Sequence, residues 1–278
     1  MQLGDFGIWT SYRAIGEENA GEAAKLVQEL GFATFWLGGS PKLPTVAPLL
    51  EATDNLIVAT GIVNVWQNEP ATVAAEHAEL SRSFPDRLLL GIGAGHPEAT
   101  SDYSRPLATM RSFFDGLDAA QRRSRDTGVG AAALGPKMLD LSAQRSRGAH
   151  TYFVPVEHTR FARQRLGEAA LVAPELACVV ESDDDRARAK ARDYAALYLG
   201  LSNYTANLLK FGFSDADIAG GGSDRLIDAI IPHGSAEQIA VVARAHLDAG
   251  ADHVCLQPVG VSGTPRQEWT ALAVALGL

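Results

Sequence analysis

The chain has 278 residues, of which 46% are hydrophobic and 21% charged, so it can bury a large core as a soluble globular protein. Its formal net charge of −9 argues against nucleic acid or an anionic membrane surface as the main partner, because both require clustered lysine and arginine. The short basic cluster of Arg122, Arg123 and Arg125 is interpreted as a solvated helix end.

The two cysteines, Cys178 and Cys255, lie in apolar runs, where a thiol behaves as a small buried hydrophobe. They predict neither a disulfide nor a metal site, and they indicate a reducing compartment. Residues 1–10 lack the basic and apolar segments of a signal peptide, and the sequence has no apolar run of transmembrane length. We therefore expect a cytoplasmic protein without membrane contact.

Apolar strands alternate with helices along the chain. In chain order the expected strands are 3–9, 33–39, 56–63, 86–93, 128–134, 149–155, 175–181 and 252–257. The clearest helices are expected at 20–30, 43–54, 69–84, 135–146, 157–167, from 183 onward, and at 235–250, where Ser235 and Gln238 form a capping box.

This alternation predicts an α/β fold, a (β/α)8 TIM barrel that forms one domain over 1–278, because the strands are apolar enough for a parallel sheet buried on both faces. A doubly wound sheet is the competing fold. The polar, glycine-rich stretch 200–232 is expected as an insertion between strands seven and eight that covers the barrel mouth, with Gly220–Gly222 as a flexible lid and Ser223 as a helix N-cap.

A glycine-rich turn follows the fourth expected strand, in the stretch 88–98 (LLLGIGAGHPE). Glycines there let a backbone approach another group closely. A dinucleotide-binding fingerprint needs glycines at the first, third and sixth positions directly opening a helix, whereas here His96 and Pro97 follow Gly95. In a barrel, the same glycines lie at the carboxyl end of strand four, on the face where barrel active sites are built.

Three segments, 61–98 (GIVNVWQNEPATVAAEHAELSRSFPDRLLLGIGAGHPE), 132–155 and 251–257, together resemble the luciferase-like monooxygenase superfamily, and within it the coenzyme F420-dependent (deazaflavin) oxidoreductases. The resemblance implies a barrel that binds the cofactor ring at its C-terminal mouth and passes hydride between the ring and a small organic substrate. It also implies a homodimer, for which the alanine-rich helix around 71–80 offers a flat surface.

The resemblance assigns cofactor-binding roles to particular residues. The ring would pack against an irregular third strand, where relatives have a cis peptide bond, and the phosphate would bind at a helix N-terminus beside a lysine. The residues implied are Gly61, Ile62 and Asn64 on one side of the ring, Ala94 and Gly95 at its other edge, Gly135, Pro136 and Lys137 at the phosphate, and Tyr152 and Phe153 beside the tail.

The sequence also departs from its relatives. Many deazaflavin enzymes carry an Asp-His pair at the end of strand two, where this chain has Gly38, Gly39 and Ser40. His96 stands where related enzymes have a glutamate proton donor. It is the candidate catalytic residue, because an imidazole exchanges protons near neutral pH; the alternative is a loop histidine that only hydrogen-bonds the backbone or cofactor.

Other residues keep two interpretations. Gly135-Pro136-Lys137 could simply begin a helix, and Trp9, Trp36 and Trp66 either line a substrate pocket or pack in the core. His158 and Arg160 could reach a cofactor tail or lie at the surface, and Gln257 ends strand eight near the mouth.

The expected function is an F420-dependent oxidoreductase. One alternative is an FMN-dependent luciferase-like monooxygenase that uses O2 and a flavin reductase partner. The other is a non-catalytic deazaflavin- or flavin-binding protein, an interpretation favoured by the missing Asp-His pair.

Overall fold

The computed structural model describes residues 1–99, 103–120 and 128–278, so the basic cluster 122–125 lies outside the described residues. The strands are β1 Phe6–Ser11, β2 Thr34–Gly38, β3 Ile57–Gly61, β4 Val63–Asn64, β5 Leu88–Gly93, β6 Val129–Ala132, β7 Gly148–Thr151, β8 Leu171–Val180, β9 His233–Gly234 and β10 Val254–Pro258. The helices are α1 Tyr12–Ile15, α2 Ala20–Glu29, α3 Ala47–Glu51, α4 Pro70–Ser83, α5 Pro106–Ala120, α6 Pro136–Arg145, α7 Val156–Leu166, α8 Asp184–Leu199, α9 Ser202–Lys210, α10 Asp215–Ile218, α11 Asp224–Ile230, α12 Ala236–Asp248 and α13 Arg266–Leu276. Within the described residues, none of these helices has the length and apolar character needed to cross a membrane.

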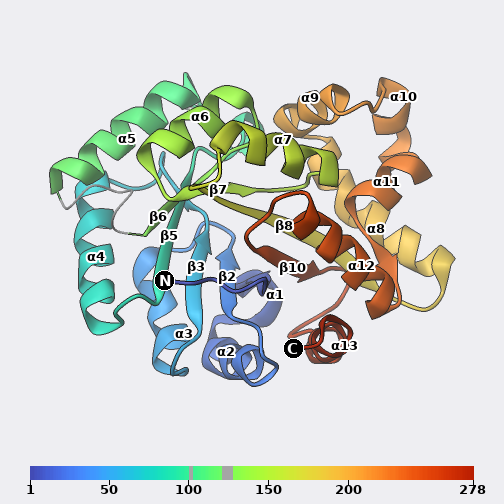
Figure 1. Cartoon of the computed structure of the whole chain (residues 1–278), viewed down its shortest axis with the longest axis horizontal. Helices are drawn as coiled ribbons and strands as arrows, with labels where there is room; N and C mark the ends of the chain where they lie inside the picture. Colours follow the sequence, from blue (N-terminus) through green and yellow to red (C-terminus); the bar gives the residue numbers. More distant parts are fainter. Residues whose placement is uncertain (100–102, 121–127) are drawn as a thin grey trace.

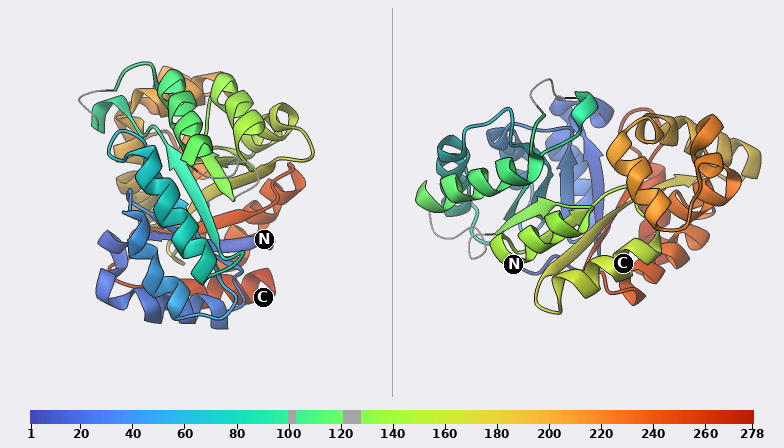
Figure 2. Two further views of the ribbon diagram at one scale, coloured as in Figure 1. Left: turned by 90° about the vertical axis from the view of Figure 1, so that its left-hand side faces the viewer. Right: turned by 90° about the horizontal axis from the view of Figure 1, so that it is seen from above.

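The described strands close into a parallel barrel surrounded by helices (Figures 1 and 2). The order is β1, β2, β3, β5, β6, β7, β8 and β10, and β10 closes the ring by pairing with both β8 and β1. Two short strands add to it, because β4 continues the third barrel strand along β5 and β9 pairs with the end of β8. The predicted (β/α)8 barrel is confirmed, and the doubly wound alternative is excluded.

Alternate residues of each strand face opposite sides of the barrel wall, as the two-residue period of a strand requires. Residues such as Ile8, Phe35 and Val58 belong to the large core between the strands and helices. The barrel interior holds a separate apolar cluster, made of Leu3, Trp9, Trp36, Ile57, Ala59, Leu89, Ala173 and Cys255. The carboxyl ends of the strands then form the mouth above this cluster.

The insertion 200–232 is helical, containing α9, α10 and α11, and Figure 1 shows these helices beside α8. Its apolar residues recur at helical spacing within a polar and glycine-rich composition, so the sequence indicates an insertion there but only one helix start, at Ser223. Tyr204, Leu208, Leu226, Ile227 and Ile230 form the core between these helices and the barrel. The N-cap role of Ser223 and the capping box of Ser235 and Gln238 are confirmed.

Candidate functional site

The third barrel strand is interrupted at the mouth. β3 ends at Gly61, the Gly61–Ile62 peptide bond is cis, and β4 resumes at Val63 beside Ile92 of β5. The predicted departure from regular strand geometry and the predicted cis bond are both confirmed. The Ile62 side chain lies over β5, where a Cβ on Gly93 would be only 3.0 Å from Ile62 Cδ1.

The glycines of β5 let this strand approach β3 closely. A Cβ on Gly91 would lie 2.0 Å from the Thr60 carbonyl oxygen. Thr60 Oγ1 accepts a hydrogen bond from Gly91 N at 2.8 Å and donates one to Gly91 O at 2.9 Å. Gly95 has a φ of +63°, which favours glycine. The glycine run of 91–95 is therefore explained by strand packing at the mouth.

Asn64 and Trp66 position the loop after β5. Asn64 Oδ1 accepts a hydrogen bond from Trp66 N at 2.9 Å, and Trp66 Nε1 donates to Ala94 O at 2.6 Å. A Cβ on Gly95 would lie 3.3 Å from Asn64 Nδ2. The structure thus brings together, on one side of the mouth, the predicted residues Gly61, Ile62, Asn64, Ala94 and Gly95.

His96, which follows Gly95 in the β5 loop, contacts two residues of the insertion. Its Nδ1 lies 3.2 Å from Asn203 Oδ1, and its ring centroid lies 5.0 Å from that of Tyr204. Because an amide oxygen only accepts, Nδ1 carries the proton and Nε2 keeps its lone pair. Burial lowers the pKa of His96, although the Asn203 hydrogen bond and the nearby Glu98 oppose the shift. His96 is therefore neutral at pH 7, and its Nε2 is a hydrogen-bond acceptor.

Tyrosine side chains from α8 and from the residue after β7 meet Gln257 near the end of β10. Tyr152 OH donates to Gln257 Oε1 at 2.7 Å and lies 2.7 Å from Tyr194 OH and 3.0 Å from Tyr198 OH. Burial raises the pKa of Tyr152, so the phenol stays neutral. Sequence reasoning missed Tyr194 and Tyr198; their four-residue spacing, which puts them on one face of α8, is the signal that could have found them.

The Trp9 indole fills the space at the ends of β2 and β3. A Cβ on Gly38 would lie 2.0 Å from Trp9 Cζ2, and a Cβ on Gly61 would lie 2.6 Å from Trp9 Nε1. The ring centroid of Trp9 is 5.3 Å from that of Tyr152. Trp9 therefore occupies the region where the resemblance places an Asp-His pair, and no side chain fits on Gly38 while the indole lies there.

The helix α6 begins at the carboxyl end of β6, as expected for a phosphate site. Gly135 is its N-cap, without a side-chain hydrogen bond, and Pro136 is its first residue. A Cβ on Gly135 would meet no atom within 4 Å, and Lys137 in the first turn is exposed. The backbone N–H groups of this helix start are thus open to an anion.

Tyr152 and Phe153, the two residues predicted to lie beside the cofactor tail, pack near Gln257 and Tyr198. Tyr152 points to Gln257, and Phe153 is buried and stacks on Tyr198 with ring centroids 5.0 Å apart. For both, a role beside a cofactor tail stays a prediction. His158 is also buried rather than at the surface, since its Nε2 lies 2.9 Å from Leu134 O and burial lowers its pKa to about 4.

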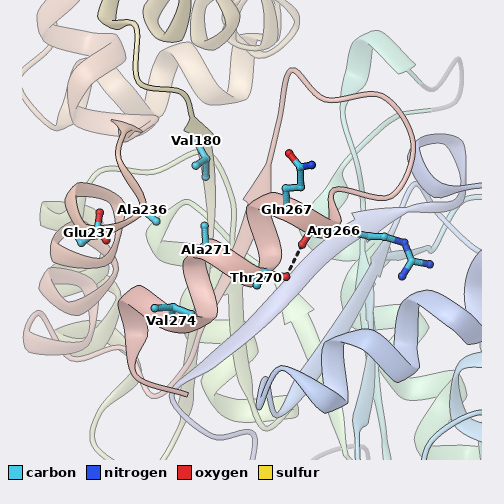
Figure 3. Close-up of a pocket in the computed structure, with 8 residues that line it drawn as sticks. All are labelled: Val180, Ala236, Glu237, Arg266, Gln267, Thr270, Ala271 and Val274. Atoms are coloured by element: carbon cyan, nitrogen blue, oxygen red, sulfur yellow. Dashed lines mark hydrogen bonds between the residues drawn. The ribbon is translucent and has the colours of Figure 1, made fainter.

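A separate hollow lies on the outside of the barrel, between α12 and α13 (Figure 3). Its volume is about 650 Å³. None of the predicted site residues lines it; the lining consists of Val180, Ala236, Glu237, Arg266, Gln267, Thr270, Ala271 and Val274. Across residues 1–99, 103–120 and 128–278, no group of three or more His, Cys, Asp or Glu side chains is arranged to hold a metal ion.

Residues 3–125, which contain the interrupted third strand and the β5 loop, match the sequence profile of the luciferase-like monooxygenases. The matched segment, 3–125, is less than half of the chain. A curated protein, 5,10-methylenetetrahydromethanopterin reductase from Methanolobus tindarius, is 25% identical over 45% of this chain and 47% of that protein. The chain therefore aligns with about half the length of that relative.

Solved structures share the barrel fold over nearly the whole chain. An F420-dependent secondary alcohol dehydrogenase in complex with an F420-acetone adduct is 15% identical, with a TM-score of 0.76 and 99% of both chains covered. The coenzyme F420-dependent tetrahydromethanopterin reductase from Methanopyrus kandleri is 14% identical, with a TM-score of 0.73 and 98% of both chains covered. The oxygenating constituent of 3,6-diketocamphane monooxygenase from Pseudomonas putida, in complex with FMN, is 12% identical, with a TM-score of 0.72 over 98% of this chain and 96% of that one. At these identities the likeness concerns the fold.

Proposed function

We propose that this protein belongs to the luciferase-like family and is an F420-dependent oxidoreductase that passes hydride between the deazaflavin ring and a small organic substrate. The observation that carries the proposal is that the β3–β4 break, the β5 loop and the start of α6 all lie at one end of the barrel. These are the three segments expected to hold the ring and the phosphate. The F420-dependent proteins among the relatives and structural neighbours support the choice of cofactor.

The residues at the mouth fit such a cofactor. Trp9 Nε1 and His150 Nε2 are buried, and neither has a hydrogen-bond partner among the described residues. An unpaired buried polar atom costs roughly 1–3 kcal/mol, a cost that a bound polar ring can offset. Gly135 and Lys137 at the start of α6 would hold the phosphate.

When bound, the deazaflavin supplies the hydride chemistry, and the chain orients the reactants and moves the proton. His96 Nε2 carries the free lone pair at the mouth, so it would accept the proton of a substrate hydroxyl. The bond from Nδ1 to Asn203 keeps the ring in the tautomer that this role requires.

The FMN-dependent monooxygenase remains the second candidate, because the FMN-bound neighbour matches the fold about as well as the F420-dependent ones do. The absence of the Asp-His pair favours a non-catalytic binding protein. Fluorescence titration with F420 and with FMN decides between the two cofactors, and turnover with reduced cofactor and a panel of acceptors excludes the non-catalytic candidate. Tighter binding of FMN would replace the proposal with the monooxygenase, and binding of neither cofactor would refute both.

Replacing Lys137 tests the phosphate site. Lys137→Ala should weaken F420 binding about 10- to 100-fold, because a charge-assisted contact to a phosphate contributes roughly 1.5–3 kcal/mol. The control is Lys25→Ala, which removes another exposed lysine, on α2. If wild type and Lys137→Ala bind F420 with equal affinity, the phosphate binds at another place, and the proposed ring site is not contradicted.

We further propose that the protein is a homodimer. Helix α4 exposes the small residues Ala71 and Ala75, which permit close contact between helices. Light scattering at micromolar concentration should give twice the chain mass of 29.5 kDa. A particle of 29.5 kDa would contradict the dimer.

A further inference from the structure

The barrel interior contains buried polar atoms that the protein itself does not pair. Three of them belong to residues that face the mouth: Trp9 Nε1 on β1, His150 Nε2 on β7 and Glu175 Oε1 on β8. These residues are 8%, 5% and 1% exposed, so bulk water does not supply the missing hydrogen bonds. Buried polar groups in native proteins are nearly always paired, so this concentration of unpaired atoms calls for a partner.

The three residues lie in one region. A Cβ on Gly61 would be 2.6 Å from Trp9 Nε1 and 3.4 Å from His150 Nε2, so both ring nitrogens face the same point beside the interrupted strand. The centroid of the Tyr152 ring lies 5.3 Å from that of Trp9 and 6.2 Å from that of His150. Glu175 adjoins them, because its Oε2 accepts a hydrogen bond from Phe153 N, the residue after Tyr152.

The register of the strands places Glu175 above His150. His150 pairs with Ala173, and Ala173 belongs to the interior cluster with Trp9. Glu175 follows two residues later, so it lies on the same face of β8 and nearer to the mouth. The unpaired atoms therefore lie around the upper end of the barrel interior.

The hydrogen-bonding character of each atom follows from its surroundings. Trp9 Nε1 can only donate. His150 Nδ1 lies 2.8 Å from Ala173 O and must carry the proton, so Nε2 is an acceptor; burial lowers the pKa of His150 to about 4, which keeps the ring neutral. Burial raises the pKa of Glu175 to about 8, and since Oε2 accepts from the backbone, the acid proton lies on Oε1, which donates.

We infer that Trp9, His150 and Glu175 bind the imide edge of the cofactor ring, formed by a carbonyl, an N–H and a second carbonyl. Two protein donors face the two carbonyl oxygens, and the single protein acceptor receives the N–H. The inference rests on the proposed function in requiring a ring cofactor, and it holds for deazaflavin and flavin alike because both rings carry this edge.

The test measures ring binding rather than turnover. Wild-type protein is titrated with F420 and FMN, and with lumiflavin and its N3-methyl derivative, which blocks the N–H and adds bulk at that point. N3-methylation should weaken binding about tenfold or more, since it removes one buried hydrogen bond and leaves His150 Nε2 unpaired. This arm needs no variant, so a folding defect cannot obscure it.

Variants then assign the contacts. Trp9→Phe and His150→Asn should each weaken binding about tenfold; asparagine keeps a donor for Ala173 O and removes only the nitrogen that faces the ring. Glu175→Leu should weaken binding similarly, whereas Glu175→Gln, which retains a donor, should restore it. The control is Trp269→Phe, which deletes another buried, unpaired indole N–H, located in α13 outside the barrel interior.

The outcomes separate the two hypotheses. If F420 or FMN binds but N3-methylation and all three site variants leave ring affinity unchanged, the imide-edge site is wrong and the proposed function survives. If Trp269→Phe weakens binding as much as Trp9→Phe does, the effect is on folding and the Trp9 contact is refuted. If no ring binds, the proposed function fails, and the imide-edge site fails with it.

Discussion

Acidification from pH 7 to pH 4 should remove most of the stability of this protein. The reason is a set of buried, neutral histidines whose pKa burial lowers from 6.5 to about 4, namely His150, His158, His246 and His253. Between these two pH values the unfolded chain binds protons that the folded chain does not. The contribution of these histidines to stability is therefore fully present above pH 6.5 and is lost as the pH falls toward 4.

The expected size follows from linkage. A shift of this extent contributes about 3 kcal/mol per histidine, and the whole stability of a typical domain is only about 5–15 kcal/mol. Glu175 acts in the opposite sense, because its raised pKa means that stability falls as the pH rises from about 4.5 to about 8. The maximum is therefore expected near pH 6.5.

Urea unfolding at pH 4, 5, 6 and 7 measures this dependence. His246→Asn should make the acid slope shallower, because the asparagine cannot be protonated but can still hydrogen-bond to Thr159 Oγ1, which lies 2.8 Å from His246 Nδ1. An unfolding free energy that stays constant from pH 7 to pH 4 would show that these histidines titrate normally in the folded protein.

Adding a single methyl group at Gly38 should destabilise the barrel by about 2–3 kcal/mol, the usual cost of overpacking a rigid core. A Cβ there would lie 2.0 Å from Trp9 Cζ2, and the indole is held between the ends of two strands and the Tyr152 ring. The strain should be relieved by Trp9→Phe, since phenylalanine lacks the outer ring atoms that clash. The double variant should therefore be at least 1 kcal/mol more stable than the sum of the single changes predicts.

Thermal or urea unfolding of the four proteins in this cycle gives the coupling energy. Gly130→Ala is the matched control, because it is another buried strand glycine, but the atom nearest to its added Cβ is Gly148 O at 4.0 Å. It should change stability by no more than about 0.5 kcal/mol. Additive effects of Gly38→Ala and Trp9→Phe would mean that the two residues do not compete for space.

The barrel could be predicted from the sequence because its determinants are local. Each strand is a short apolar run, each helix has a recognisable start, and the capping box at Ser235 is a signal confined to four residues. The break after Gly61 was also predictable, through the family resemblance of 61–98 rather than through any periodicity. Of the helices in 200–232, only the start of α11 at Ser223 was predictable, because the few apolar residues of α9 and α10 are diluted by polar residues and glycines.

The inner part of the site depends on contacts between residues that are distant in the chain. His96 bonds to Asn203 across 107 positions, and Tyr152 bonds to Gln257 across 105. No pattern within one element indicates such pairs. Glu175 was hidden for a different reason: it begins the expected strand 175–181, and an acidic residue at a strand boundary reads as exposed, whereas β8 starts at Leu171 and buries it.

The exclusion between Trp9 and any side chain at position 38 also constrains how such a site can evolve. A lineage with this tryptophan could not acquire a residue such as aspartate or histidine at position 38 by one substitution, because the intermediate would carry two side chains in one space. Trp9 would have to shrink first, which empties the interior before the new side chain arrives. A direct change from one arrangement of the mouth to the other thus passes through a destabilised intermediate.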